Sequence, residues 1–406
     1  MAKFQFDSAR EAQASRAFLV TVSIGRQLPF DAGEELAELV RSDGLEPVGL
    51  MQARRDKPDA ATYLGSGKIE EIKNLAKAAK ADVVVFDAAL SAAQERNISQ
   101  IVEMAVLDRT ELILEIFRRR AKSKEGRLQV ELARLEHLAT RLVRGWTHLE
   151  RQRGGLGKTG GPGEKQIELD RRMIGTRVKM LRDQLKKLQR QRDTQRRSRT
   201  RGDALTVSLV GYTNAGKSTL FNRLTRAESY AANQLFATLD TTARRCWIND
   251  DETVVLSDTV GFIRGLPHQL VEAFKSTLDE TVHADVLLHV VDSSSPVRDE
   301  QIRSVNLVLA QIKADDIPVI TVLNKCDVSG LEPAIQRHAD GTVKSVAVSA
   351  VTGEGLDLLR EALGEFSGRW REENKPVPRE LEPWEYDLPE SGQSDEEALK
   401  ALERML

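Results

Sequence analysis

The feature that most constrains this chain is a glycine-rich loop between an apolar strand and a helix. Residues 205–210 predict a buried strand, residues 211–218 (GYTNAGKS) follow at once, and a helix is predicted from about Ser218. Glycines let successive backbone N–H groups converge on phosphates, while Lys217 supplies a positive charge and the Ser218 hydroxyl a magnesium ligand. The alternative is a chance match in a glycine turn, and the flanking strand and helix argue against it. We therefore expect an α/β domain with a mostly parallel sheet that binds a nucleotide.

A second motif indicates which base is bound. Residues 324–327 (NKCD) follow the predicted strand 318–323, so their side chains emerge at the carboxyl end of the sheet. The Asp327 carboxylate can accept two hydrogens from the guanine edge, whereas adenine would leave it without a matching pair of donors. The motif resembles the NKxD signature of GTPases, and residues 349–351 (SAV) resemble the loop that closes over the guanine O6.

Two further segments suit the phosphate end of such a site. Residues 258–261 (DTVG) follow a strand and resemble the DxxG element, in which Asp258 holds magnesium through water and the Gly261 N–H senses the γ-phosphate. Between the two motifs, residues 236–242 (FATLDTT) offer a second magnesium threonine. Thr238 is favoured, and Thr241 and Thr242 remain alternatives.

The predicted site combines these four segments. The expected catalytic residues are Lys217, Thr238 and Gly261, and the expected magnesium ligands are Ser218, Thr238 and, through water, Asp258. The residues expected to bind GTP are Gly211, Tyr212, Thr213, Asn214, Ala215, Gly216, Lys217, Ser218, Phe236, Ala237, Thr238, Leu239, Asp240, Asp258, Thr259, Val260, Gly261, Asn324, Lys325, Cys326, Asp327, Ser349, Ala350 and Val351.

Charge is strongly segregated, although the net charge of the 406 residues is only −2. Residues 118–201 hold 26 Lys and Arg against nine Asp and Glu. Leucines and isoleucines form heptad-like stripes over 126–153 and 167–188, and the glycine-rich stretch 154–163 lies between them. We expect a basic antiparallel helical hairpin with a glycine-rich tip that binds nucleic acid, rather than a flexible linker. The tip residues expected to contact RNA are Arg151, Arg153, Gly154, Gly155, Gly157, Lys158, Gly160, Gly161 and Gly163.

The remaining regions complete a multidomain α/β chain. Residues 1–117 alternate short apolar runs with helical patterns and predict a smaller α/β domain, residues 202–368 form the nucleotide-binding domain, and residues 369–406 are an acidic, proline-containing tail. The sequence lacks an apolar run of about eighteen residues and a signal-peptide pattern at its start. We expect a monomeric cytoplasmic protein that does not insert into membranes.

The order of these motifs resembles the translation-factor-related class of P-loop GTPases and, more narrowly, the HflX family of ribosome-associated GTPases, over about residues 15–365. The resemblance implies a GTP-dependent factor, stimulated by the ribosome, that binds the large ribosomal subunit and its rRNA and splits stalled or idle ribosomes. The segments that carry the resemblance are 65–68 (GSGK), 108–117 (DRTELILEIF), 161–172 (GPGEKQIELDRR), 211–222 (GYTNAGKSTLFN), 235–240 (LFATLD) and 258–263 (DTVGFI).

Two positions bear on the rate of hydrolysis. Phe262 stands where Ras-like enzymes carry the glutamine that orients water, and a phenyl ring cannot do this. We therefore expect slow turnover by the chain alone, with rRNA or another partner completing the site. Asn214 resembles the asparagine with which related GTPases hold a potassium ion, and a loop-capping role is the alternative.

Residues 65–68 raise the question of a second nucleotide. A glycine turn before a helix could hold phosphate, but Ile69 occupies the place of the hydroxyl, which favours a plain turn and cap. The resemblance keeps ATP binding by the N-terminal domain open. Two other functions therefore compete with ribosome splitting: a GTP-dependent switch that acts on a protein partner, and an ATP-dependent RNA remodeller.

Overall fold

The computed structural model describes residues 15–25, 31–144, 162–200, 204–226, 235–249, 252–266, 270–271 and 274–373. The chain divides into two units, Met1–Gly364 and Glu365–Leu406. Within the described ranges, no helix is both long and apolar enough to cross a bilayer. The acidic tail from residue 374 onward lies outside them.

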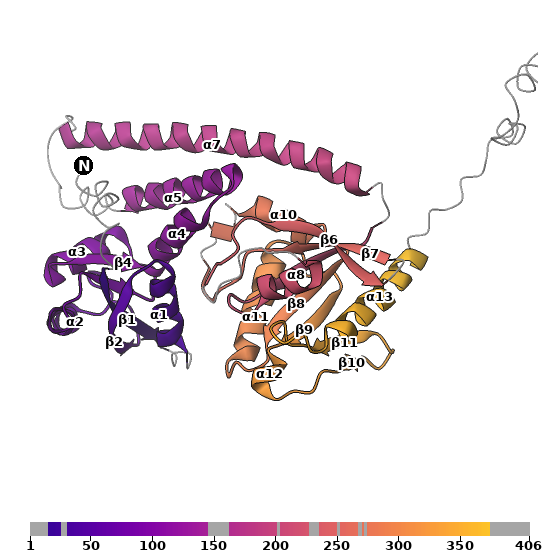
Figure 1. Ribbon diagram of the computed structural model, residues 1–406. Helices are drawn as coiled ribbons and strands as arrows, with labels where there is room; N and C mark the ends of the chain where they lie inside the picture. Colours follow the sequence, from indigo (N-terminus) through magenta and orange to yellow (C-terminus); the bar gives the residue numbers. More distant parts are fainter. Residues whose placement is uncertain are drawn as a thin grey trace, which may run out of the picture. The chain divides into compact units, whose positions relative to one another are not determined.

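The N-terminal region is built on a four-stranded, fully parallel sheet in the order β2-β1-β3-β4 (Figure 1). The expected small α/β domain is thus confirmed, although the four-residue strand β4 and the polar helix α3 were not predicted. The elements are β1 (Arg16–Ile24), α1 (Ala32–Ser42), β2 (Glu46–Arg55), α2 (Ser66–Ala78), β3 (Val83–Phe86), α3 (Ala92–Val102), β4 (Ala105–Asp108) and α4 (Arg109–Arg120).

Helices cover both faces of this sheet, because its central strands are apolar on both sides. Ala17 and Leu19 of β1 pack in the same core as residues of α1 and α4. Their neighbours Phe18 and Val20 point the other way and pack with residues of α2 and α3. Burial on both faces explains why β1 reads as a continuous apolar run rather than an alternating one.

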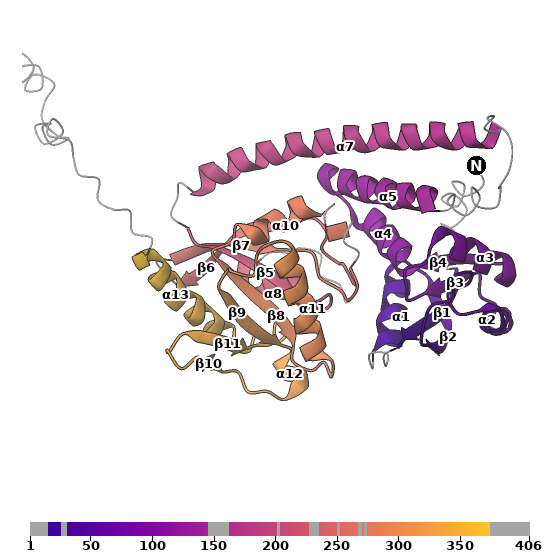
Figure 2. The same ribbon diagram turned by 180° about the vertical axis from the view of Figure 1, so that it is seen from behind.

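Two long helices follow, α5 (Lys124–Arg144) and α7 (Pro162–Thr200). The two views show them side by side and running in opposite directions, as the sequence predicted (Figures 1 and 2). Arg177 of α7 pairs with Glu131 of α5 at 2.7 Å, and Arg182 pairs with Glu136 at 2.6 Å.

One boundary of the hairpin differs from the expectation. Pro162 and Gly163 were assigned to the tip loop, but both lie in α7, since proline is well suited to the first position of a helix. The predicted tip residues Arg151, Arg153, Gly154, Gly155, Gly157, Lys158, Gly160 and Gly161 lie outside the described residues.

The second sheet has seven strands in the order β10-β11-β9-β8-β5-β7-β6. The five inner strands are parallel, and the edge strands β6 and β10 are antiparallel to their neighbours. The strands predicted at 205–210 and 318–323 are confirmed. The two edge strands were missed, because one alternates between polar and apolar residues and the other is very short. The strands are β5 (Thr206–Gly211), β6 (Thr242–Asn249), β7 (Glu252–Asp258), β8 (Val286–Asp292), β9 (Val319–Asn324), β10 (Ile335–Arg337) and β11 (Val343–Ala347).

Helices lie along the two faces of this sheet (Figure 2), and the carboxyl ends of β5, β7, β8 and β9 meet at one edge. In an open parallel sheet this edge is where ligands bind. The helices are α8 (Lys217–Thr225), α10 (Lys275–Val282), α11 (Arg298–Gln311), α12 (Cys326–Ser329) and α13 (Leu356–Glu373).

Candidate nucleotide-binding site

The glycine-rich loop runs from the end of β5 at Gly211 to the start of α8 at Lys217. Gly211 and Gly216 have φ angles of 149° and 93°. A Cβ on Gly216 would lie 2.2 Å from Asn324 Nδ2, and one on Gly211 would lie 2.2 Å from the Val290 carbonyl oxygen. Both positions therefore need glycine, for space as well as for backbone conformation.

Lys217 is buried beneath this loop. Its Nζ donates to the carbonyl oxygens of Gly211 at 3.0 Å and Tyr212 at 2.8 Å. Burial lowers the pKa of Lys217 to about 8, while the negative charge of Asp258 opposes the shift. An ammonium group has three donors, so one remains for an anion held by the loop.

Three oxygen-bearing side chains meet beside the lysine. Ser218 Oγ donates to Asp258 Oδ2 at 2.8 Å, Thr238 Oγ1 donates to the same oxygen at 2.9 Å, and the two hydroxyls are 2.7 Å apart. Burial raises the pKa of Asp258, although the bond from Ser218 opposes this. Asp258 Oδ1 is buried without a hydrogen-bond partner.

Of the three threonines proposed from sequence, the structure brings Thr238 to this cluster. Thr242 instead opens β6, where it pairs with Asp258 in the strand ladder. Hydroxyl and carboxylate oxygens are the ligands that Mg²⁺ prefers, so the donor set and the unpartnered Asp258 oxygen fit this ion.

The DxxG segment is attached directly to the glycine-rich loop. The Phe262 N–H donates to the Gly211 carbonyl at 3.1 Å, and the Phe262 carbonyl accepts from the Thr213 N–H at 2.7 Å. A Cβ on Gly261 would lie 3.0 Å from Lys217 Nζ. The Phe262 side chain is buried and does not line the pocket, so it cannot orient a water molecule there.

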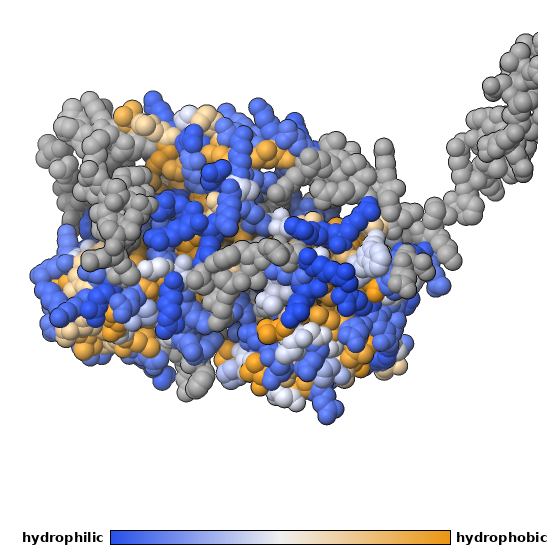
Figure 3. All heavy atoms as spheres, in the orientation of Figure 1, coloured by the Kyte–Doolittle hydropathy of each residue, from blue (hydrophilic) through white to orange (hydrophobic). Residues whose placement is uncertain are grey.

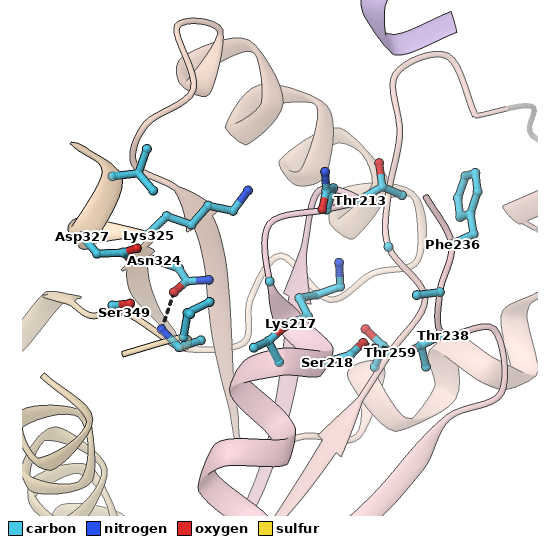
Figure 4. Close-up of a pocket in the computed structure, with 18 residues that line it drawn as sticks. Thr213, Lys217, Ser218, Phe236, Thr238, Thr259, Asn324, Lys325, Asp327 and Ser349 are labelled. Atoms are coloured by element: carbon cyan, nitrogen blue, oxygen red, sulfur yellow. Dashed lines mark hydrogen bonds between the residues drawn. The ribbon is translucent and has the colours of Figure 1, made fainter. Parts of the chain in front are cut away.

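Asn324 organises the opposite end of the pocket, where the base is expected. Its Nδ2 donates to the Ala215 carbonyl at 2.8 Å, and its Oδ1 accepts from the Ala350 N–H at 3.0 Å (Figure 4). Lys325 pairs with Asp292 at 2.6 Å, and the exposed Asp327 lines the pocket from α12. The side-chain amide of Asn324 thus links the phosphate loop to the segment predicted to close over the base.

The structure brings most of the predicted residues into one pocket (Figure 4). Thr219 and Val328 also line it and were missed, although Thr219 directly follows the glycine-rich motif. The predicted residues that line the pocket are Thr213, Asn214, Gly216, Lys217, Ser218, Phe236, Ala237, Thr238, Thr259, Gly261, Asn324, Lys325, Asp327, Ser349, Ala350 and Val351. Those that do not are Gly211, Tyr212, Ala215, Leu239, Asp240, Asp258, Val260 and Cys326.

The Tyr212 side chain belongs to a buried polar network that sequence reasoning did not find. Its hydroxyl donates to Glu35, and burial raises the pKa of the tyrosine. Arg109 pairs with Glu35 and Asp87, and Arg264 lies 3.4 Å from each of these two carboxylates. The contacts of Tyr212 and Arg264 with these two carboxylates span 177 to 229 residues, and such separations leave no local pattern in a sequence.

The segment 65–68 forms a turn and the start of α2. Gly65 has a φ of 90°, and its N–H donates to Thr62 Oγ1 at 3.0 Å. Lys68 pairs with Glu71 at 2.8 Å. These contacts favour the turn-and-cap interpretation, and ATP binding by this region stays a prediction.

Together, the loop, the buried lysine and the NKxD strand end define a P-loop GTPase. Three family descriptions match the chain: "GTP-binding GTPase N-terminal" over residues 31–118, "GTP-binding GTPase Middle Region" over 120–199 and "50S ribosome-binding GTPase" over 206–325. The GTPase HflX of Escherichia coli (strain K12) is 50% identical over 351 residues, which cover 86% of this chain and 82% of that protein.

The GTPase HflX of Magnetococcus marinus is 49% identical over 337 residues, which cover 83% of this chain and 78% of that protein. The chain therefore belongs to the HflX family, and it is a GTP-hydrolysing enzyme. A crystal structure of a GTP-binding protein from Sulfolobus solfataricus with GDP is similar over 88% of this chain and 99% of that one, with 23% identity and a TM-score of 0.45.

Proposed function

We propose that this GTPase binds the large ribosomal subunit and splits stalled or idle ribosomes into subunits. The observation that carries the proposal is the basic segment 118–201, with its 26 Lys and Arg against nine Asp and Glu. Most of this segment lies in α5 and α7, and a slender basic hairpin suits an RNA-walled space because its cations neutralise phosphates. The family description "50S ribosome-binding GTPase" over 206–325 supports the same partner.

The described part of α7 presents this charge to solvent. In Figure 3 hydrophilic and hydrophobic residues are mixed along the surface where Figure 1 places α7. The exposed hydrophobic residues of this part of α7 are Leu169, Met173 and Met180. The exposed basic residues of α7 include Arg171, Lys179, Arg182, Lys186 and Lys187. A helix with this composition favours RNA phosphates over an apolar protein surface.

In the proposed mechanism, the loop 211–218 holds the phosphates through its backbone N–H groups. Lys217 donates to the β- and γ-phosphate oxygens, and the Gly261 N–H contacts the γ-phosphate. Ser218 and Thr238 would hold magnesium directly and Asp258 would hold it through water. Magnesium, when bound, neutralises charge on the β- and γ-phosphates. At the other end, Asp327 accepts the two guanine N–H groups, and the Ala350 region closes over O6.

The residue at position 262 of this chain, Phe262, cannot position the attacking water. Because Phe262 is buried and apolar, we infer slow hydrolysis by the protein alone and stimulation by the ribosome. Asn214 lines the phosphate end and has a φ of 63°, which suits both a potassium ligand and a turn residue. Equal rates of hydrolysis in sodium and potassium buffers would remove the potassium assignment.

Salt-dependent binding tests the proposal. Full-length protein with a non-hydrolysable GTP analogue is sedimented with large subunits over a series of KCl concentrations. The matched variant carries Arg171→Gln, Lys179→Gln and Lys186→Gln, and the control carries three neutralised cations of the GTPase domain. We expect the hairpin variant to reduce the slope of log affinity against log salt by about 2, since each phosphate contact contributes about 0.7 to 0.9.

A splitting assay on a sucrose gradient then asks whether ribosomes dissociate with GTP and whether the hairpin variant fails to split them. Salt-insensitive binding, or binding that the three substitutions leave unchanged, would contradict an RNA-contacting hairpin. It would favour the switch that acts on a protein partner.

A further inference from the structure

The segment that carries Thr238 is held by residues far away in the sequence. The Phe236 ring packs edge-on against Phe117 at the end of α4, with ring centroids 4.6 Å apart, and the Phe117 ring also packs on Phe274 at 4.7 Å. Leu235 donates its N–H to Ser42 Oγ at 3.2 Å. Thr238 itself points the other way, toward Ser218 and Asp258 (Figure 4).

Asp240 makes the most specific of these contacts, at the start of helix α5. Its Oδ2 accepts from the backbone N–H groups of Lys122 at 3.1 Å and Ser123 at 2.8 Å, and its Oδ1 accepts from the Ser123 hydroxyl. Ser123 Oγ in turn accepts from the Gly126 N–H at 2.8 Å in the first turn of α5. A carboxylate is favoured here because a helix start presents unpaired N–H groups and a partial positive charge.

Gly126 gives a second, independent observation in favour of a role for the contact between Asp240 and the start of α5. A Cβ at this position would lie 2.4 Å from Asp240 Oδ1 and 3.1 Å from Ser123 Oγ. Its φ is not in the left-handed region, so the helix itself does not require glycine there. Alanine would favour the helix by about 1 kcal/mol, and the space that Asp240 occupies is what argues for glycine.

We propose that Asp240 is a positioning residue for GTP hydrolysis, which holds Thr238 in place by anchoring its segment to the first turn of α5. Asp240 lies only two positions after Thr238, so release of Asp240 frees Thr238 to leave the cluster with Ser218 and Asp258. The same contact ties the bound nucleotide to the helical hairpin. By reciprocity, GTP strengthens the anchor as much as the anchor strengthens GTP binding.

The proposal rests on the assignment of Thr238 to magnesium, and the experiment tests the two separately. Affinities of the full-length protein for fluorescent GDP and a non-hydrolysable GTP analogue are measured with Mg²⁺ and with EDTA. The variants are Asp240→Ala, Gly126→Ala, Thr238→Ala and, as control, Asp340→Ala. Asp340 also accepts a backbone N–H, from Thr342 at 2.9 Å, but in an exposed loop.

We expect Asp240→Ala and Gly126→Ala each to weaken binding of the GTP analogue by about fivefold or more in Mg²⁺, with GDP affinity unchanged. The double variant should lose no more than Asp240→Ala alone, since both changes break one contact. Asp340→Ala should leave both affinities as they are.

If Asp240→Ala folds poorly, Gly126→Ala still tests the proposal. This variant should fold, because alanine favours the helix. Parent-like affinities in Gly126→Ala would overturn the proposal, and so would an equal loss of GDP and GTP-analogue binding in Asp240→Ala. If Thr238→Ala leaves the affinity ratio unchanged, the magnesium assignment itself is wrong. If Thr238→Ala loses GTP-analogue binding but Asp240→Ala does not, only the positioning role is wrong.

Discussion

Asp87 follows β3 in the first sheet and Asp258 ends β7 in the second, and both carboxylates are buried at the carboxyl end of a parallel strand. Burial raises the pKa of each. Asp87 is paired with Arg109, whereas Asp258 has two hydroxyl partners on one oxygen and none on the other. The comparison teaches that the two buried acids differ in what completes them: protein partners pair with Asp87, whereas the unpartnered oxygen of Asp258, beside the pocket, is accounted for by a ligand.

The largest expected effect comes from removing the cation that pairs with Asp87. Arg109→Met leaves Glu35 and Asp87 buried without their main cation, which costs about 3 to 5 kcal/mol of unfolding free energy. Urea unfolding measures this cost. The control is Arg298→Met, because its pair with Asp299 has 41% and 76% exposed side chains and should contribute less than about 1 kcal/mol. A loss below 1 kcal/mol for Arg109→Met would show that the network is not a stabilising one.

The next largest effect concerns recognition of the base in the nucleotide pocket. Asp327→Asn replaces a double acceptor with one acceptor and one donor, which no longer matches the guanine edge but matches xanthine. We expect GTP affinity to fall about 10²-fold and XTP affinity to rise. Competition with fluorescent GTP measures both, with Asp340→Asn as the control. Unchanged selectivity would place the base elsewhere.

A smaller effect is the pH dependence of stability from His289, which is buried on β8. Burial, and then the nearby charge of Lys217, lower the pKa of His289 to about 4. The unfolded chain binds a proton below about pH 6.5 and the folded chain does not, so stability falls as the pH drops from 6.5 toward 4.

By pH 5 the loss attributable to His289 is about 2 kcal/mol. Urea unfolding at pH 7 and pH 5 of the parent, His289→Gln and the control His283→Gln isolates it. The same pH dependence in the parent and in His289→Gln would mean that folding does not lower the pKa of His289.

Local motifs explain why so much of the candidate site was predictable. Gly211 to Ser218 is a strand end, a loop and a helix start in one short stretch, so its geometry follows from neighbouring residues. Thr238 was favoured over Thr241 and Thr242 from the sequence, and the structure places it beside Ser218.

Contacts between distant segments explain what was not predictable. Asp240 was expected at the nucleotide, but its carboxylate binds Ser123, 117 residues earlier. Tyr212 was expected at the nucleotide for its place in the motif, yet its hydroxyl binds Glu35. Backbone contacts of these residues with GTP stay predictions, because sequence spacing carries no information on which face of a loop meets another domain.

The most direct test of the central claim is GTP hydrolysis by the full-length protein with and without large ribosomal subunits, alongside Lys217→Ala. We predict slow turnover alone, at least about 10²-fold stimulation by the subunits, and loss of the stimulated rate in Lys217→Ala. A parent rate that is the same with and without subunits would contradict a ribosome-completed site.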